Sequence, residues 1–545
     1  MRNRAGGPLR SRRHRRLSPA KNESEFLMSA EAATIQAIRP VQSRRFALNL
    51  VTNVGNLGLS MVVGVLYVPF LVRHLGPAVY GLIPLTSLVT SYMALITVGL
   101  DSAVARYLTI ALERKDHENA NLIFNVSLWG NLALSALLVI PAVAAIAQVD
   151  HILRIPPGSE ASTRWLFVGT VAAFLLNQVK TPFGVSSFCR NRLDLLNLVA
   201  ASETLARVGL VVCLFCIFTP RIEYVGTAIL AGTIVSTVGM VWLWKVLTPS
   251  LRISLGQFDR TMFRNLCSTG GWVLISQLGV MLYLNIDLLL ANRIFGPEQG
   301  GRYAAVLALP TLLRSLASAV GGIFAPTMYH IYARGDIDGL VIYLNRAIKF
   351  VGLVMALCIG LICGFSEPLL RLWLGPAFGS LESLLFLMAI HLCMSLSMYP
   401  LYALPLAANR VKVPGVATLA IGVVNLLLAL FMVWVLGWGM YGLASAGAIT
   451  LTVRHLLFTP LYGARVLNQP YGTFFRGVVP IVLATLATIG MCRLILWRWV
   501  VSNWIDFGIA ALGVSLLYAA VVYLLLSPEE RLTLRDATFR SRKKA

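Results

Sequence analysis

Six ionisable residues interrupt the long apolar runs of this sequence: Lys180, Glu203, Arg207, Asp287, Arg314 and Arg454. A charged side chain at the centre of a membrane helix costs roughly 2.5–3.5 kcal/mol on insertion scales, so such residues usually serve a function or pair with one another. Four of the six are cations and two are acids. The resulting excess of positive charge favours an anionic ligand, such as a phosphate or a diphosphate.

Helical spacing suggests a partner for only some of these charges. Glu203 and Arg207 stand four residues apart, so we expect them to pair on one helix face. Asp287 falls near the outer end of its apolar run, where an interfacial position is the alternative to a role in ion coupling. The remaining three cations have no local partner and either extend to the membrane surface, pair with a distant acid or line a cavity.

The first apolar run also has a polar face. Asn49, Asn53 and Asn56 are spaced by four and three residues and therefore share one side of a helix. Amides exposed to lipid are costly, so this side should contact a cavity or bond to neighbouring helices. The candidate substrate ligands are therefore Asn49, Asn53, Asn56, Lys180, Arg207, Arg314 and Arg454, and the candidates for ion coupling are Asp287 and Glu203.

The chain that must position these residues has the composition of a membrane protein. Of its 545 residues, 57% are hydrophobic and 13% are charged, whereas soluble domains are about a quarter charged. Runs of about 20 apolar residues recur, each long enough to cross a ~30 Å hydrocarbon core. This pattern excludes a soluble enzyme, a disordered protein and a disulfide-stabilised scaffold.

Fourteen membrane-spanning helices are predicted, so both termini lie on the same side. The predicted spans are 46–72, 82–100, 121–147, 165–188, 198–219, 225–247, 266–291, 303–329, 348–365, 380–406, 415–436, 440–462, 477–497 and 506–526. The loops and tails on the side of the termini hold 32 Lys and Arg residues, and the loops on the other side hold 8. Positively charged loops remain in the cytoplasm, so we expect cytoplasmic termini.

An internal repeat divides these spans. Arg73, Gly76, Pro77 and Gly81 recur 220 residues later as Arg293, Gly296, Pro297 and Gly301. Asn191-Arg192 recurs at Asn409-Arg410, and Gly226 recurs at Gly442. We therefore predict two six-helix lobes in the same orientation, with substrate sites between them near the membrane midplane.

This repeat gives the predicted domain organisation. It comprises a basic disordered cytoplasmic tail (1–45), an N-lobe (46–247), a cytoplasmic linker (248–265), a C-lobe (266–462), two further spans (463–526) and a second basic tail (527–545). The tails lack the folded basic surface with aromatics that nucleic-acid binding requires, so the expected contacts of the chain are with membrane lipids.

Several short strings resemble the polysaccharide transporter branch of the multidrug/oligosaccharidyl-lipid/polysaccharide exporter superfamily. The resemblance covers about residues 44–526. Its strings are Leu75–Gly81, Val98–Asp101 with Arg106, Asn285–Asp287, Phe295–Pro297, Tyr303-Ala304, Trp373–Phe378, Ala408–Arg410 and Tyr441–Ala444. The order and spacing of these strings, rather than any single one, make the likeness specific.

The resemblance implies an all-α fold of two six-helix lobes with two additional C-terminal helices. It also implies flipping of a polyprenyl-diphosphate-linked oligosaccharide across a bacterial inner membrane for O-antigen, capsule or exopolysaccharide synthesis. Relatives work by alternating access and often use ion gradients or the membrane potential. A polysaccharide polymerase and assembly proteins are the implied partners. No motif of the family assigns the ligands, so the candidate ligands rest on the charge argument above.

Three alternatives remain at this stage. An ion-coupled drug or cation antiporter of the same fold would prefer an acidic interior. An integral membrane glycosyltransferase or polymerase would need a large outer loop, and a passive scaffold would not explain unpaired interior cations. We expect no catalytic residue, cofactor or metal site: Cys213-Leu-Phe-Cys216, for example, has no second pair or histidine cluster to complete a site.

Overall fold

The computed structural model describes residues 51–254, 271–475 and 477–525, together with Arg45, Leu48, Asn49, Asp259, Met262 and Phe263. Nearly all of both predicted tails and most of the predicted linker after residue 254 lie outside the described residues. Every regular element within those ranges is helical. Thirteen of the helices in the described part of the chain are long and apolar enough to cross a membrane. The predicted all-α membrane fold is confirmed.

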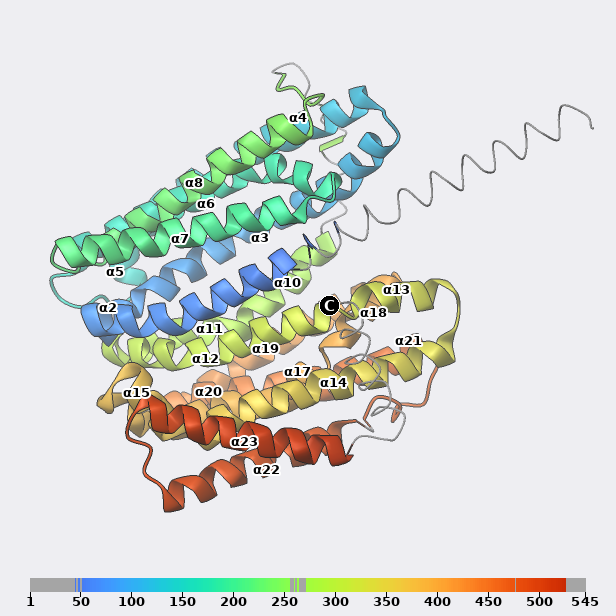
Figure 1. Cartoon of the computed structure of the whole chain (residues 1–545). Coiled ribbons are helices and arrows are strands. Elements are labelled where there is room, and N and C mark those ends of the chain that lie inside the picture. The colour runs from blue at the N-terminus through green and yellow to red at the C-terminus, as the bar shows by residue number, and fades with distance from the viewer. Residues whose placement is uncertain are drawn as a thin grey trace, which may run out of the picture.

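The N-terminal half begins with the helix Val51–Leu75. It continues with α2 (Pro77–Tyr80), α3 (Leu82–Glu113), α4 (His117–Ala147), α5 (Val149–Ile152), α6 (Glu160–Cys189), α7 (Leu193–Ile217) and α8 (Glu223–Leu247). Helices α3, α4, α6, α7 and α8 lie together in the upper part of Figure 1. The second predicted span ended too early, because α3 continues to Glu113.

The C-terminal half contains more and shorter elements. They are α10 (Gly271–Leu284), α11 (Ile286–Phe295), α12 (Pro297–Gly322), α13 (Ala325–Ala333), α14 (Ile337–Gly364), α15 (Ser366–Leu374), η1 (Pro376–Leu381), α16 (Glu382–Ile390), α17 (Leu392–Ser397), η2 (Tyr399–Ala403), α18 (Leu404–Ala407), α19 (Lys412–Trp434), α20 (Gly439–Thr452), η3 (Val453–Phe458), α21 (Thr459–Val466), α22 (Val478–Arg498) and α23 (Trp504–Leu525).

Several predicted spans of the C-lobe are interrupted helices, and two of these interruptions lie at or beside predicted site residues. The seventh span breaks at Asn285 into α10 and α11. The twelfth, predicted at 440–462, is helical from Gly439 to Val466 but contains the π-helical segment η3. This span is additional to the thirteen helices counted above. Interruptions of this kind often accompany functional sites, because they leave backbone groups free to bind a ligand.

The repeat is visible in the backbone geometry. Gly76 and Gly296 both have positive φ, 77° and 88°, and each precedes the proline that begins α2 or α12. Asn191 and Asn409, the second repeated pair, have φ of 51° and 52°. Glycine and asparagine tolerate this left-handed conformation better than other residues, so the repeated residues serve repeated turns.

The two halves meet closely at the end that carries the loops predicted to be outer. Gly81 and Gly301, equivalent residues of the repeat, lie against each other: a Cβ built on Gly81 would lie 2.7 Å from Cα of Gly301. Trp373 Nε1 donates to the carbonyl oxygen of Val65 at 2.6 Å. Arg73 Nη2 donates to the carbonyl oxygen of Leu372 at 3.3 Å. These contacts close the bundle at this end, near α2 and α15 in Figure 1.

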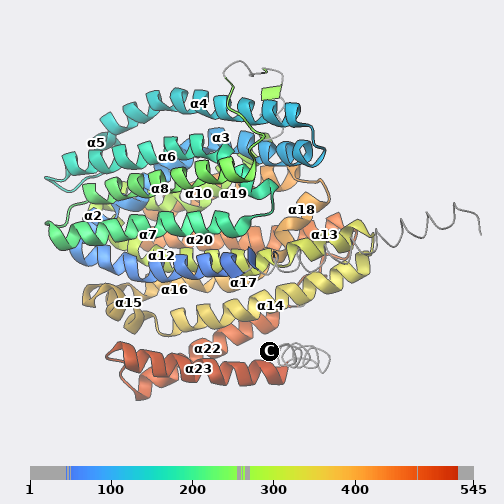
Figure 2. The same cartoon turned by 45° about the horizontal axis from the view of Figure 1, so that its top comes forward.

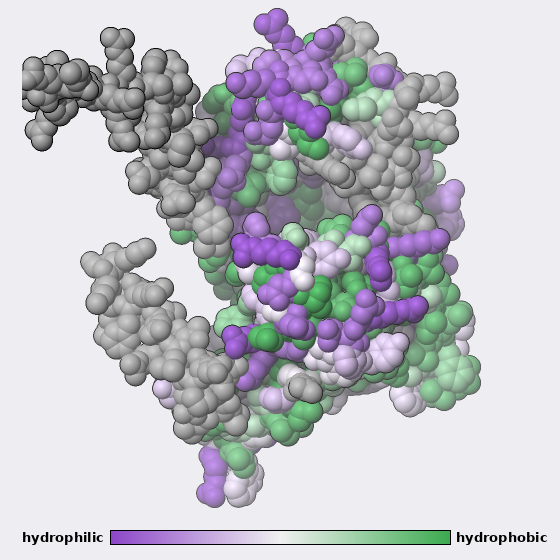
Figure 3. All heavy atoms as spheres, turned by 90° about the vertical axis from the view of Figure 1, so that its right-hand side faces the viewer, coloured by the Kyte–Doolittle hydropathy of each residue, from purple (hydrophilic) through white to green (hydrophobic). Residues whose placement is uncertain are grey.

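Figure 3 views the opposite end, where hydrophilic side chains gather around a recess between the upper and lower parts of the molecule. The bundle is therefore closed at the end near α2 and α15 and recessed at the opposite end.

The last two helices form a separate layer. Figure 2 shows α22 and α23 at the edge of the bundle, below α14 and away from the N-terminal half. Three glycines of α14 allow α22 to approach closely: Gly352 contacts Ile481, Gly360 contacts Thr488 and Gly364 contacts Cys492. Small residues at such positions are typical of membrane helix packing, where close approach of backbones supplies much of the association energy.

Candidate transport site

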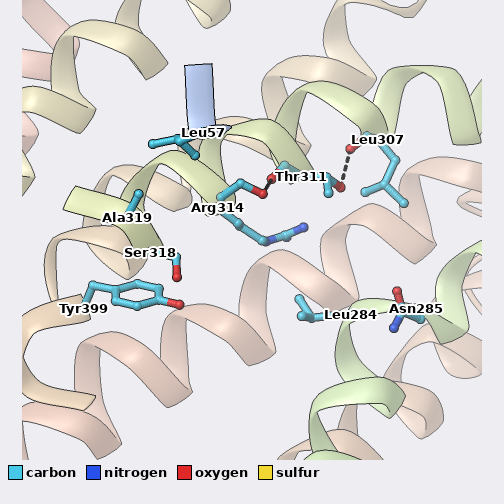
Figure 4. Close-up of a pocket in the computed structure, with 10 residues that line it drawn as sticks. Leu57, Leu284, Asn285, Leu307, Thr311, Arg314, Ser318, Ala319 and Tyr399 are labelled. Atoms are coloured by element: carbon cyan, nitrogen blue, oxygen red, sulfur yellow. Dashed lines mark hydrogen bonds between the residues drawn. The ribbon is translucent and has the colours of Figure 1, made fainter. Parts of the chain in front are cut away.

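A cavity of about 520 Å³ lies between the first helix and the C-terminal half. Its lining consists of Leu57 from the helix Val51–Leu75 and otherwise of residues from α10, the break after it, α12 and η2: Leu284, Asn285, Leu307, Thr311, Arg314, Ser315, Ser318, Ala319 and Tyr399. Figure 4 shows the Arg314 side chain projecting into this cavity. The volume is within the roughly 300–1,000 Å³ that is usual for small-molecule sites.

One face of α12 supplies most of the polar lining. Thr311, Ser315 and Ser318 are exposed, and their spacing puts them on the same side of the helix as Arg314. We did not anticipate these hydroxyl groups from the sequence, although their spacing of four and three residues was a usable signal. Of the seven predicted substrate ligands, Arg314 is the one that lines the cavity.

Arg314 also borders a second, much smaller cavity of about 20 Å³ inside the C-lobe. Asp287 and His391 line this smaller space from α11 and from the junction of α16 and α17. Its volume is sufficient for one water molecule. Arg314 therefore lies between the large cavity and a polar interior, and it forms no ion pair within the described residues.

Asp287 is buried rather than interfacial, with 8% of its surface exposed. Asn425 Nδ2 of α19 donates to Asp287 Oδ1 at 3.4 Å, and Thr450 Oγ1 of α20 donates to Asn425 Oδ1 at 2.8 Å. A Cβ on Gly447 would lie 3.2 Å from Asp287 Oδ2, so this glycine leaves space beside the carboxylate. Its hydrogen-bond partner is neutral, and the charged group nearest in influence is Arg314, which lines the same small cavity without forming an ion pair with it. A buried carboxylate without an ion pair is suited to bind a cation or a proton.

Arg454 belongs to a neighbouring network in the same lobe. Its guanidinium donates to the Tyr283 hydroxyl at 2.5 Å and to Thr418 Oγ1 at 2.9 Å. Arg454 is part of the π-helical segment η3, and its charge lies over the Tyr283 ring. Hydrogen bonds inside the lobe therefore occupy the guanidinium of Arg454, which was predicted as a substrate ligand. It forms no ion pair with an acid among the described residues.

The predicted pairing in the N-lobe was wrong. Glu203 pairs with Lys180, not with Arg207: Lys180 Nζ lies 3.2 Å from Glu203 Oε2 and donates to Ser236 Oγ at 2.7 Å. Lys180 is on α6 and Ser236 is on α8, so three helices hold the pair. Lys180 therefore has a partner that helical spacing on its own could not reveal.

Arg207 lies one turn from Glu203, beside Tyr67 of the first helix. Its Nε and the Tyr67 hydroxyl are both buried, and neither has a hydrogen-bond partner within the described ranges. Arg207 is the charged group that acts most strongly on Tyr67. Neither residue is part of the lining of the 520 Å³ cavity.

The three asparagines of the first helix have different environments. Asn49 joins the first helix to the start of α7: its Nδ2 donates to the Asn191 carbonyl oxygen at 3.2 Å, and its Oδ1 accepts from the Asp194 amide at 2.9 Å. Asn53 is exposed. Asn56 has a buried Oδ1 with no partner in the described part of the chain. Leu57, the next residue, is the one that lines the cavity.

Comparison with known proteins explains this arrangement. Residues 49–331 match the family described as polysaccharide biosynthesis protein. The chain belongs to this family. It is also 34% identical over 502 residues to the membrane protein EpsK of Bacillus subtilis (strain 168), a match that covers 92% of this chain and 99% of that protein.

Solved structures of two transporters share the fold. The lipid II flippase MurJ in an inward closed conformation matches with a TM-score of 0.60 at 14% identity, over 88% of this chain and 99% of MurJ. An inward-facing multidrug resistance MATE family transporter of the MOP superfamily matches with a TM-score of 0.61 at 14% identity, over 76% of this chain and 94% of the transporter. At this identity the likeness concerns the fold alone.

The family match and the fold agree with the resemblance found in the sequence. This polysaccharide biosynthesis family member is a multi-pass membrane protein. It shares its fold with a lipid flippase and with multidrug transporters, and the sequence predicted a fold of this kind.

Proposed function

We propose that this protein flips a polyprenyl-diphosphate-linked oligosaccharide from the cytoplasmic to the outer leaflet of a bacterial inner membrane. Both termini are then cytoplasmic, and the flipped lipid is consumed by a polysaccharide polymerase and its assembly proteins. The observation on which the proposal rests is Arg314, a cation that forms no ion pair among the described residues, in a cavity of about 520 Å³. A diphosphate is the group that would neutralise such a cation.

The head of this lipid is charged and hydrated, whereas its tail is apolar. The polar wall of α12 would shelter the head during its passage through ~30 Å of hydrocarbon. The polyprenyl tail can remain in the bilayer. Arg314 is therefore the first candidate for contact with the diphosphate. The other three predicted cations would add positive charge to the site from within the lobes, without lining the cavity. They are Lys180, Arg207 and Arg454.

We propose Asp287 as the ion-coupling residue and regard Glu203 as a structural partner of Lys180. Asp287 is buried, accepts a hydrogen bond from a neutral amide and forms no ion pair among the described residues, so binding of a cation or a proton would relieve the cost of its burial. Glu203 already has an ammonium group at 3.2 Å. It therefore has little need of an additional cation.

Deletion of the gene tests the function directly. The expected result is loss of surface polysaccharide, with the lipid-linked oligosaccharide trapped in the inner leaflet. Arg314→Gln at normal protein levels should reproduce this result, and Arg302→Gln, at an exposed ion pair on the same helix, is the matched control. Undiminished polymer without a trapped intermediate would reject the proposal.

Alternating access of the two lobes is the proposed mechanism, with the Gly81–Gly301 contact as part of the outer gate. A Cβ at Gly301 would overlap the Pro77 carbonyl, so Gly301→Ala should hold this end open. A cysteine introduced at Leu57 in a cysteine-free background should then react with an impermeant maleimide added from outside. Gly322→Ala, where a Cβ meets open space, is the control. Equal protection of the cysteine in both variants would count against this gate.

The ion-coupled drug or cation antiporter remains the second candidate, and the buried Asp287 is the observation in its favour. Efflux of a cationic dye from vesicles separates the two functions. Export of the dye that disappears in Asp287→Asn, together with normal polysaccharide in the deletion strain, would support the antiporter. The third alternative, a membrane glycosyltransferase or polymerase, would instead leave sugar transfer, not flipping, defective after deletion.

A further inference from the structure

The two ends of the 520 Å³ cavity offer different chemistry. Figure 4 shows the Arg314 guanidinium at the end near Leu284 and Asn285, whereas the hydroxyl groups of Ser318 and Tyr399 point into the other end. Arginine is a donor without acceptor capacity, so it suits phosphate oxygens. The end formed by Ser318 and Tyr399 has no charged residue in the cavity lining. It therefore suits a neutral group.

The hydroxyl groups along α12 are prepared to accept hydrogen bonds. Thr311 Oγ1 donates to the Leu307 carbonyl oxygen at 2.9 Å, and Ser315 Oγ donates to the Thr311 carbonyl oxygen at 3.1 Å. The single hydrogen of each hydroxyl is thereby used, and its lone pairs remain available. Both residues are exposed in the cavity wall. Such a wall recognises a ligand that carries hydroxyl donors.

Tyr399 is held in place by residues behind it. Its ring lies 4.7 Å from the Tyr402 ring, which lies 5.4 Å from the His455 ring. Gly321 of α12 allows the close approach, because a Cβ there would lie 2.9 Å from Cβ of Tyr399. A supported aromatic ring loses little conformational entropy when a ligand stacks on it.

We propose that Tyr399, with Thr311, Ser315 and Ser318, forms a platform for the first sugar ring of the transported lipid. A pyranose has an apolar C–H face that packs on an aromatic ring, and it has hydroxyl groups that donate to the α12 wall. With the diphosphate at Arg314, the adjoining sugar lies toward Tyr399. The inference rests on the proposed function and adds the requirement that the head be glycosylated.

Binding to the purified full-length protein in nanodiscs tests this platform. The probes are polyprenyl diphosphate and the same lipid carrying one glucose. The unsubstituted protein should bind the glucosyl lipid more tightly, by about fivefold if one stacking contact is responsible. Tyr399→Leu should lose this preference but retain its affinity for the bare diphosphate. Arg314→Gln should weaken the binding of both lipids.

Three further variants control for folding and for effects at the protein surface. Tyr399→Phe keeps the ring and should retain most of the preference, and Ser318→Ala should reduce it in part. Tyr471→Leu removes an exposed tyrosine far along the chain and should change nothing. Equal affinity of the unsubstituted protein for the two lipids, or a preference that survives in Tyr399→Leu, would overturn the platform. Failure to bind either lipid would instead reject the proposed function itself.

Discussion

The N-lobe and the C-lobe carry polar residues at equivalent positions of the repeat but use them differently. Asp287 lies 220 residues after Tyr67, and Asn425 lies 218 residues after Arg207. In the N-lobe the carboxylate of Glu203 is neutralised by Lys180 at 3.2 Å. In the C-lobe the carboxylate of Asp287 has an amide as its partner. The N-lobe therefore contains an ion pair, whereas the C-lobe contains a buried acid that forms no ion pair among the described residues, as the proposed ion coupling requires.

The helices of the two lobes also differ: those that carry the N-lobe pair are continuous, whereas those beside the C-lobe acid are interrupted. Helices α6, α7 and α8 continue without a break past Lys180, Glu203 and Ser236. In the C-lobe the chain breaks at Asn285, two residues before Asp287, and a π-helical segment contains Arg454. Regular helices satisfy their own backbone groups, and broken ones can offer them to a ligand. We infer from this difference that the N-lobe serves as a rigid structural support and that the C-lobe forms the proposed transport site.

The largest expected effect comes from removal of the C-lobe carboxylate. Asp287→Asn should abolish the part of the flipping rate that depends on an ion gradient, a loss of about tenfold or more, because a buried acid of this kind is retained for function. Flipping in proteoliposomes with imposed sodium, proton or potassium gradients measures it. Tyr67→Phe, at the equivalent N-lobe position, is the control and should retain the dependence. An equal loss of the ion-dependent flipping rate in both variants would show that the two lobes do not differ in ion coupling.

Loss of the N-lobe pair should affect stability rather than coupling. Glu203→Leu leaves the ammonium of Lys180 without its carboxylate and should destabilise the protein by about 3 kcal/mol. Lys180→Met combined with Glu203→Leu should recover most of that loss. Thermal unfolding in detergent measures both, and the double variant should still flip lipid. A double variant that is stable but inactive would show that the N-lobe pair takes part in transport and is not merely structural.

Crowding beside Asp287 should weaken ion binding without removing the carboxylate. Gly447→Ala brings a methyl group to 3.2 Å from Asp287 Oδ2. We expect the ion concentration for half-maximal flipping to rise by about tenfold, which corresponds to a modest overpacking cost. Gly508→Ala, where a Cβ meets open space, is the comparison. An unchanged ion requirement would show that the coupling ion does not bind on this side of Asp287.

The smallest effect concerns the junction of the first helix with α7. Asn49→Ala removes the bonds to Asn191 and Asp194 and should lower stability by about 1 kcal/mol with little change in flipping. Asn53→Ala, at an exposed residue, should be neutral. If Asn49→Ala instead impaired flipping at normal stability, this asparagine would regain the ligand role that the sequence predicted.

Sequence reasoning succeeded for the features that depend on length and local conformation. Apolar runs of about 20 residues predict spans because the bilayer has a defined thickness. Repeated Gly-Pro and Asn-Arg pairs predicted repeated turns, since few residues accept positive φ. An isolated cation in an apolar run is costly and points to a polar cavity, and Arg314 lines one, whereas its role as a substrate ligand stays a prediction.

The pairing of charges and the shape of the cavity required the tertiary structure. Local spacing favoured Glu203 with Arg207, yet the rotation of α6 and α7 about their axes brings Lys180 to Glu203 instead. No local rule predicted the break at Asn285 or the meeting of Gly81 with Gly301. The sequence by itself determined the membrane-spanning segments and the repeated turns, because each depends on one segment and on the thickness of the bilayer. Only packing between distant segments decided which polar groups meet, because the neighbours of a side chain depend on how its helix is turned and on what lies against it.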